Sequence, residues 1–152
     1  MNAQLIYRQT YQETQKHIDR LKNAFNTLKD KGFLPLDEEK IDTILEDDYL
    51  LAILDQIVYR FSKLQDSLAK LVKSYLYIKG ENVENLTMVD ILNKLEKLEL
   101  GITKEKWFEL RELRNILVHE YEDEKYKIAK TFNKIYDEIN FFENFLGKLK
   151  DE

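Results

Sequence analysis

The chain contains no cysteine among its 152 residues, so disulfide bonds, a thiolate nucleophile and a cysteine-ligated metal site are all excluded. It has only two histidines, and so few imidazoles without cysteine do not favour a transition-metal site. One proline and four glycines leave few turns and favour long elements. No apolar run approaches the roughly 18 residues of a membrane span, and residues 1–10 lack the apolar core of a signal peptide. We therefore expect a cytoplasmic protein without metal, cofactor or membrane partner.

What is present is a charge-rich composition. Hydrophobic residues make up 43% of the chain and charged residues 35%, a balance typical of a soluble helical protein. At 152 residues the chain is long enough for one domain with a real core. The net charge of −5 argues against a protein that coats nucleic acid, because phosphate binding needs positive charge, and DNA is not an expected partner.

The spacing of apolar residues and of helix-breaking residues predicts an all-α fold. The residues suited to end or to begin helices are Gly32, Pro35, Gly80, Gly101, Asp37, Thr87 and Thr103. The predicted helices span about residues 4–31, 38–46, 48–79, 87–100, 103–121 and, after a break at 122–125, the segment to residue 150. They predict a single domain, an up-and-down bundle of four to five helices. Residues 1–47 are expected to be an N-terminal helical extension and residues 48–150 the core bundle.

Two of these helices carry heptad seams of the kind that bundles use. The seam of the helix at 48–79 consists of Leu50, Leu54, Ile57, Phe61, Leu64, Leu68, Leu71, Tyr75 and Ile78. The seam of the last helix consists of Ile128, Phe132, Ile135, Ile139, Phe142, Leu146 and Leu149. Further apolar residues lie beside the seams, namely Leu51, Val58, Val72, Phe141 and Phe145. Such wide faces are covered either by neighbours in the bundle or by a second subunit, and we favour a homodimer.

The segment from Arg114 to Tyr121, with the sequence RNILVHEY, is the most informative part of the chain. At about 100° per residue, the apolar residues around it form one helical stripe, with Arg114 near its middle. The stripe consists of Trp107, Leu110, Leu113, Leu117, Val118 and Tyr121. A guanidinium does not lose its proton and is costly to bury alone. Arg114 therefore belongs either to a buried ion pair or to a cleft that binds an anionic ligand.

This segment has the pattern R-x4-H-x-Y, which resembles the signature of the HEPN superfamily and, within it, of the HepT toxin branch. The flanking segments Asp90-Ile91-Leu92, Gly101-Ile102, Trp107 and Leu110-Arg111-Glu112-Leu113 resemble the same branch, and the resemblance covers about residues 50–149. It implies a metal-independent endoribonuclease, the toxin of a type VII toxin–antitoxin system, which cleaves RNA in a cleft between two subunits. It also implies a cognate minimal nucleotidyltransferase as antitoxin, which transfers AMP onto the motif tyrosine.

Carried onto this sequence, the resemblance makes Arg114 and His119 catalytic, Asn115 supportive and Tyr121 the site of AMP modification. The chemistry is physically reasonable, because RNA is cut without metal when its 2′-hydroxyl attacks the adjacent phosphate. A histidine serves as acid or base near neutral pH, and an arginine stabilises phosphate charge with paired donors. Asn115 and His119, four residues apart, share a helix face. Arg114 and His119 lie roughly 140° apart on an ideal helix, so a local distortion or a second copy of the motif must complete the site.

Two other interpretations stay open. The chain is either a non-catalytic, nucleotide-binding subunit that pairs with a minimal nucleotidyltransferase, or a structural dimeric bundle in which Arg114 forms an interface ion pair. Taken singly, His119 is also compatible with a surface or core-edge position. Tyr121 is compatible with a core or helix-end position whose hydroxyl reaches water. His17 lies among polar residues and is expected to be solvated.

Charge and tyrosine are unevenly distributed. Residues 60–79 hold the basic residues Arg60, Lys63, Lys70, Lys73 and Lys79 against Asp66 alone. This face either guides RNA or is an ordinary solvated surface, which is the commoner case. Tyr49, Tyr59, Tyr75 and Tyr77 likewise either stack on bases or pack half-buried, and we favour packing. The acidic run at residues 37–48 is interpreted as helix-start and surface charge.

Overall fold

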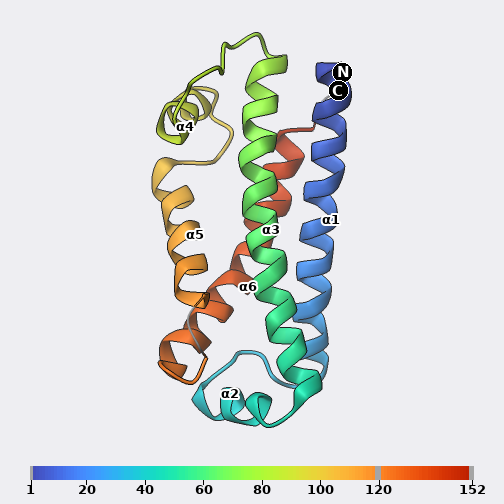
Figure 1. The fold of residues 1–152 in the computed structure, drawn as a ribbon, viewed down its shortest axis with the longest axis vertical. Helices are drawn as coiled ribbons and strands as arrows, with labels where there is room; N and C mark the ends of the chain where they lie inside the picture. The colour runs from blue at the N-terminus through green and yellow to red at the C-terminus, as the bar shows by residue number, and fades with distance from the viewer. Residues whose placement is uncertain (1, 119–120, 151–152) are drawn as a thin grey trace.

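The computed structural model describes residues 2–118 and 121–150, in which all regular secondary structure is helical. The helices are α1 (Ala3–Asp30), α2 (Glu38–Leu45), α3 (Asp48–Ile78), α4 (Met88–Lys97), α5 (Lys104–Leu117) and α6 (Lys125–Lys148), as Figure 1 shows. The predicted all-α bundle is confirmed. Its described part has six helices, and they lie at the six segments for which the sequence predicted helix, including the short α2 and α4 of 8 and 10 residues.

Local sequence determines where several helices begin. The side chain of Asp37 accepts a hydrogen bond from a backbone N–H three residues ahead, at 2.8 Å, where α2 starts. Thr87 and Asp90 form a reciprocal capping box at the start of α4. Thr103 accepts a backbone hydrogen bond at 3.0 Å where α5 starts. These side chains satisfy N–H groups that have no partner within the helix, which is why the helix starts were readable from the sequence.

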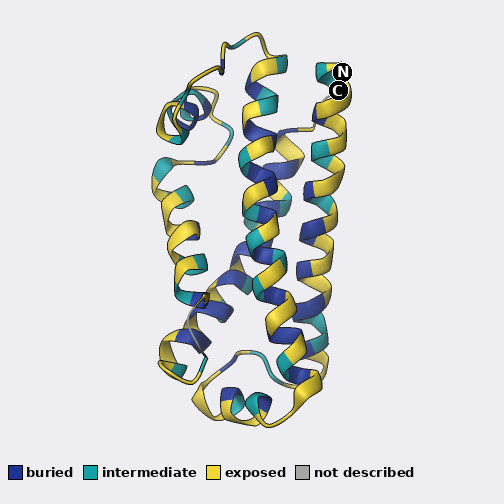
Figure 2. Cartoon of the chain, in the orientation of Figure 1, coloured by how far each residue is buried: buried dark blue, intermediate teal, exposed yellow. Residues whose placement is uncertain are grey.

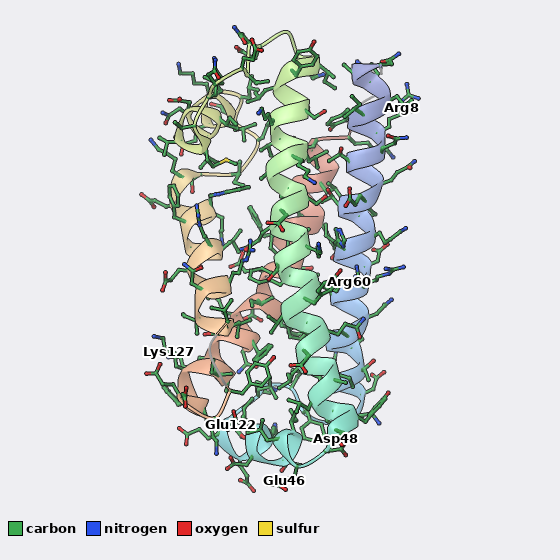
Figure 3. All side chains as sticks on the ribbon, in the orientation of Figure 1. Arg8, Glu46, Asp48, Arg60, Glu122 and Lys127 are labelled. Atoms are coloured by element: carbon green, nitrogen blue, oxygen red, sulfur yellow. The ribbon has the colours of Figure 1, made fainter. Side chains whose placement is uncertain are left out.

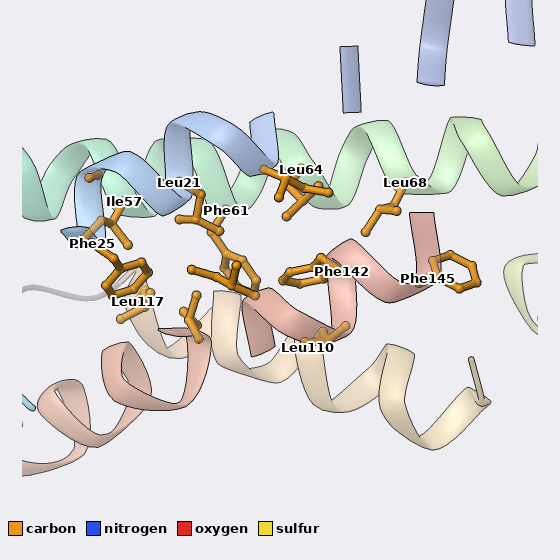
Figure 4. Close-up of a cluster of buried hydrophobic side chains, with 14 of the residues drawn as sticks. Leu21, Phe25, Ile57, Phe61, Leu64, Leu68, Leu110, Leu117, Phe142 and Phe145 are labelled. Carbon is orange, nitrogen blue, oxygen red and sulfur yellow. The ribbon is translucent and has the colours of Figure 1, made fainter. Parts of the chain in front are cut away.

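Three long helices, α1, α3 and α6, enclose the core (Figures 1 and 4). The predicted seams of α3 and α6 are buried, except that Tyr75 and Ile78 are half-buried where α3 ends. Phe61 of α3 and Phe142 of α6 are fully buried, with ring centroids 6.2 Å apart. Burial of each such large side chain contributes roughly 1.5–3 kcal/mol, so the facing seams are the main source of stability.

The helix α1 shares this core. Its fully buried apolar residues are Ile18, Leu21, Phe25 and Leu28. It lies alongside α3 (Figure 1), and Tyr11 donates a hydrogen bond at 2.9 Å to the backbone carbonyl of Leu146 in α6. Tyr7 donates another to the carbonyl of Leu149. The first predicted helix therefore forms one wall of the bundle, within the segment 1–47 that was expected to be an N-terminal helical extension.

The prediction that His17 is solvated is wrong. His17 is 8% exposed and lies between α1 and α3, with its Nδ1 atom 3.2 Å from a guanidinium nitrogen of Arg60. Burial, and then the charge of Arg60, lower the pKa of the imidazole, while nearby Glu13 opposes this in part. Lys16 and Asp19 are exposed on other faces of α1, whereas His17 shares its face with the buried Thr14 and Leu21.

The apolar residues beside the seams are largely covered within one chain. Val72 and Phe145 are buried, while Leu51, Val58 and Phe141 are half-buried. The width of the apolar faces therefore has an explanation inside the bundle, and the homodimer stays a prediction. Within residues 2–118 and 121–150, every helix is too short or too polar to cross a membrane.

The helices α4 and α5 lie beside α3 as a separate arm, which we call the α4–α5 arm (Figure 1). It packs on α3, and α5 also contacts α6. The only buried residues of α5 are Leu110 and Leu117, and its other residues are half-buried or exposed (Figure 2). The C-terminal part of α5 contains Arg114 and Asn115, the first two residues of the R-x4-H-x-Y motif.

Candidate functional site

The motif helix is shorter than predicted. α5 ends at Leu117 with Val118 as its C-cap, so the expectation of a helix to Tyr121 is wrong. Val118 is 68% exposed, and the predicted apolar stripe stops before it. The acidic residues 122–124 explain the early end, because negative charge is unfavourable at a helix C-terminus and favourable at the N-terminus of α6 that follows. His119 lies outside the described residues, so its predicted relation to Arg114 and Asn115 stays a prediction.

Arg114 is half-buried, with its side chain 36% exposed. One of its guanidinium nitrogens donates a hydrogen bond at 3.1 Å to a carboxylate oxygen of Asp66 on α3. The side chain of Asp66 is 55% exposed, so this ion pair is near the surface. Within one chain Arg114 is therefore not part of a buried ion pair, and it lies at a surface pocket.

The pocket lies between α3, α4 and α5 and has a volume of about 210 Å³. Its lining residues are Gln65, Asp66, Leu68, Ala69, Met88, Trp107, Leu110, Arg111 and Arg114. Leu68 and Leu110 are buried and form an apolar base, while the two arginines supply positive charge at the edge. Since typical pockets for drug-sized ligands have 300–1,000 Å³, this pocket suits a smaller group with an anionic end.

Gln65 links two of the helices that line the pocket. Its side-chain amide donates a hydrogen bond at 2.6 Å to the backbone carbonyl of Leu110, and so joins α3 to the middle of α5. Trp107, a member of the predicted apolar stripe, is half-buried and lines this pocket. Both residues were missed as candidate site residues, because nothing in the sequence relates Gln65 to a helix 45 residues further along the chain.

Asn115 lies on another side of α5. It is exposed and lines a second pocket of about 140 Å³ between α5 and the start of α6, together with Glu112 and Lys127. Neighbouring residues on a helix differ by about 100° in direction, which separates Asn115 from Arg114. Within one chain the structure therefore does not bring these two predicted site residues together.

Tyr121 follows α5 in a turn and packs back against the bundle. It is half-buried, its ring meets that of Phe132 edge-on at a centroid distance of 5.9 Å, and its hydroxyl donates a hydrogen bond at 2.8 Å to Asp55 on α3. The sequence suggested that the Tyr121 hydroxyl reaches water. In the structure this hydroxyl is bound to the exposed carboxylate of Asp55. The edge-on contact between the rings fixes the orientation of the phenol.

Two aspartates of α3 thus contact the motif. Asp55 holds Tyr121 and Asp66 holds Arg114. Their separation of 11 residues is close to three full turns, so they share a face of α3 about 16 Å apart. The sequence offered this spacing as a signal, but it did not indicate that the C-terminal half of α5 would lie opposite.

A second tie holds the arm at its other end. Glu138 of α6 is buried, and both of its carboxylate oxygens accept hydrogen bonds from Lys106 of α5, at 2.8 and 3.0 Å. Burial alone would raise the pKa of the Glu138 carboxyl, but the bonds from Lys106 and from Lys134 outweigh it and lower the pKa. Glu138 therefore stays ionised and anchors α5 to α6.

In the described part of the chain, no three His, Cys, Asp or Glu side chains come together in a way that could hold a metal ion. Three of the four tyrosines expected to pack half-buried are exposed instead, Tyr49 by 62%, Tyr59 by 53% and Tyr77 by 57%. In comparisons with known proteins, neither a family model nor a curated protein nor a solved structure matches this chain.

Proposed function

We propose that the chain is a metal-independent endoribonuclease of the HEPN type, similar to the HepT toxins of type VII toxin–antitoxin systems. The observation that carries the proposal is the position of Arg114 at the edge of a surface pocket, where its partner is the exposed carboxylate of Asp66. An exposed ion pair contributes only about 0–1 kcal/mol. A phosphate can therefore displace Asp66 from the Arg114 guanidinium at a small cost in free energy, and bind there in its place.

In the proposed reaction the 2′-oxygen of RNA attacks the adjacent phosphorus, and the bond to the 5′-oxygen of the next nucleotide breaks. The products are a 2′,3′-cyclic phosphate and a 5′-hydroxyl. The His119 of one copy takes the proton of the 2′-hydroxyl, and the His119 of a second copy delivers one to the leaving 5′-oxygen. Arg114 binds the non-bridging oxygens as negative charge grows on them. Because Asn115 faces away from Arg114 in one chain, the supportive role assigned to it requires the motif of a second subunit.

The same proposal includes regulation in the cytoplasm by a cognate minimal nucleotidyltransferase that modifies Tyr121 with AMP. In that step the phenolic oxygen attacks the α-phosphorus of ATP and pyrophosphate leaves. Asp55, which already accepts the hydrogen bond of the Tyr121 hydroxyl at 2.8 Å, is positioned to receive the phenolic proton. Tyr121 is thus proposed to be a point of control and not part of the cleavage reaction.

The test is cleavage of RNA by purified protein in EDTA, with mass spectrometry showing that Tyr121 carries no AMP. We expect His119→Ala to lower the rate at least about 100-fold and Arg114→Ala by a similar factor. Arg8→Ala, at an exposed arginine on α1, is the matched control and should cleave like wild type. Failure of the AMP-free wild type to cleave any RNA would refute the proposed ribonuclease.

A second function is favoured by the pocket itself, namely a non-catalytic subunit that binds a nucleotide for a nucleotidyltransferase. Trp107, Arg111 and Arg114 line one pocket, which offers an aromatic ring for a base and two guanidinium groups for a phosphate. Trp107 is also the only tryptophan of the chain, so its fluorescence reports directly on this pocket. Quenching by AMP in a protein that cleaves no RNA would support this second function over the first.

A further inference from the structure

One face of α3 presents a straight row of exposed side chains. The row, which we call the α3 stripe, consists of Tyr59, Lys63, Asp66, Lys70, Lys73 and Tyr77, all exposed. Their steps of four, three, four, three and four residues keep every member within about 40° of the same direction on a helix. The stripe is about 27 Å long at the rise of an α-helix.

The stripe is basic although the chain is acidic overall. Lys63, Lys70 and Lys73 provide three positive charges, while the negative charge of Asp66 is matched by Arg114 (−1 + 1 = 0). Across residues 2–118 and 121–150, none of the three lysines forms an ion pair. Figure 3 shows acidic side chains such as Glu46 near α2, at one end of the molecule. The stripe is therefore a site of local positive potential.

Exposed aromatic rings mark both ends of the stripe. The ring of Tyr59 is 53% exposed and has cationic groups of Arg60 and Lys63 at 5.1 and 5.6 Å from its centroid. At the other end, Tyr77 is 57% exposed and borders an open groove of about 470 Å³. The remaining lining residues of the groove are Ala3, Ile6, Lys70, Lys73, Ser74 and Val83. Apolar walls beside an exposed ring and two lysines suit a base with its phosphates.

We infer that the α3 stripe is a binding track for single-stranded RNA. The lysines contact phosphates along the strand, and Tyr59 and Tyr77 stack on unpaired bases, which is how single strands are bound without sequence preference. Because Asp66 in the middle of the stripe pairs with Arg114, a strand on this track passes the motif arginine. The inference rests on the proposed ribonuclease function, since it identifies the surface that delivers its substrate.

The test measures binding without cleavage. A fluorescein-labelled, 12-nucleotide single-stranded RNA is titrated with protein in the His119→Ala background, and anisotropy is recorded at several salt concentrations. Two double variants remove the track: Tyr59→Ser with Tyr77→Ser, and Lys70→Gln with Lys73→Gln. The matched control is Tyr126→Ser with Lys130→Gln, which removes an exposed tyrosine and the lysine 5.2 Å from its ring centroid on α6. Melting curves show that every variant is folded.

We expect each stripe variant to bind at least about tenfold more weakly than the parent protein, with the control unchanged. The lysine variant should also lower the slope of log affinity against log salt by about 1.4, that is 0.7 for each of two phosphates. Equal binding by stripe variants and control would overturn the track, even if the wild type cleaves RNA. A tyrosine variant that changes the molar mass and not the RNA affinity would overturn it too, because the stripe would then be a contact between two copies. Because the experiment measures RNA binding and not cleavage, its result can be interpreted even if the wild type cleaves no RNA.

Discussion

The long helices α1, α3 and α6 and the α4–α5 arm are held together by different means. α6 buries ten of its 24 residues, while α5 buries two of 14. α5 has few apolar contacts and is held by polar ones instead. These are the hydrogen bonds from Lys106 to Glu138, from Gln65 to the carbonyl of Leu110 and from Arg114 to Asp66. The comparison shows that stability resides in one part of the molecule and the candidate chemistry in another.

This separation has a physical reason. A side chain that binds phosphate must be reached by solvent, and a side chain that supplies hydrophobic stabilisation must not. α5 presents Arg114 and Trp107 beside a pocket, and only two of its 14 residues are buried. Substitutions in the long helices should therefore mainly lower stability, and substitutions at the pocket of the α4–α5 arm should mainly lower activity.

The largest effect is expected in the long helices. Phe61→Ala removes a fully buried ring of α3 and should lower the free energy of unfolding by about 3–5 kcal/mol. Phe108→Ala removes a ring of α5 that is 41% exposed, and should change it by less than about 1 kcal/mol. Urea denaturation of both variants measures the difference, and similar losses in the two would contradict the proposed separation.

A smaller loss is expected where the two regions are tied. Glu138→Gln removes the buried charge that Lys106 and Lys134 share, and should cost about 1–3 kcal/mol. This is less than the 3–5 kcal/mol of a fully buried pair, because both lysines are partly exposed. Glu109→Gln, which removes an exposed partner of the same Lys134, is the control and should have little effect in the same urea experiment.

The third prediction concerns pH and the contact between α1 and α3. The folded-state pKa of His17 is lowered by burial and by Arg60, so the unfolded chain binds the proton first as pH falls. The stabilising contribution is therefore present above the unfolded pKa of about 6.5 and is lost as pH falls towards the folded value. In His17→Gln this dependence should be absent. Unfolding measured between pH 7.5 and 5.5 should show wild type losing stability relative to the variant, and parallel curves would refute the prediction.

The smallest effect on stability is expected at the motif. Asp66→Asn breaks the exposed ion pair with Arg114 and should change the free energy of unfolding by less than about 1 kcal/mol. It should nevertheless strengthen RNA binding, because it removes the only negative charge of the α3 stripe. Thermal melting and RNA anisotropy test the two halves separately. A large fall in melting temperature, repeated by Arg114→Ala, would instead favour the structural interpretation of Arg114.

Much of the fold was predictable because it depends on local patterns. The heptad seam around Phe61 and the caps at Asp37, Thr87 and Thr103 are properties of neighbouring residues, and the structure follows them closely. The end of α5 was harder, since an apolar residue such as Val118 fits a helical stripe whether or not anything packs on it. The burial of His17 was also not predictable, because it depends on the packing of α1 against α3, while its polar neighbours in the sequence suggested exposure.

The sequence by itself determined an all-helical chain, the apolar seams of its long helices and the motif that contains Arg114. Tertiary structure decided the rest of the candidate site, namely that Asp66 faces Arg114, that Asp55 holds Tyr121 and that Trp107 borders a pocket. The physical reason is the range of the interactions. Helix periodicity and capping act over a few residues, whereas these contacts join residues that are 40 or more positions apart, and only the packing of helices brings them together.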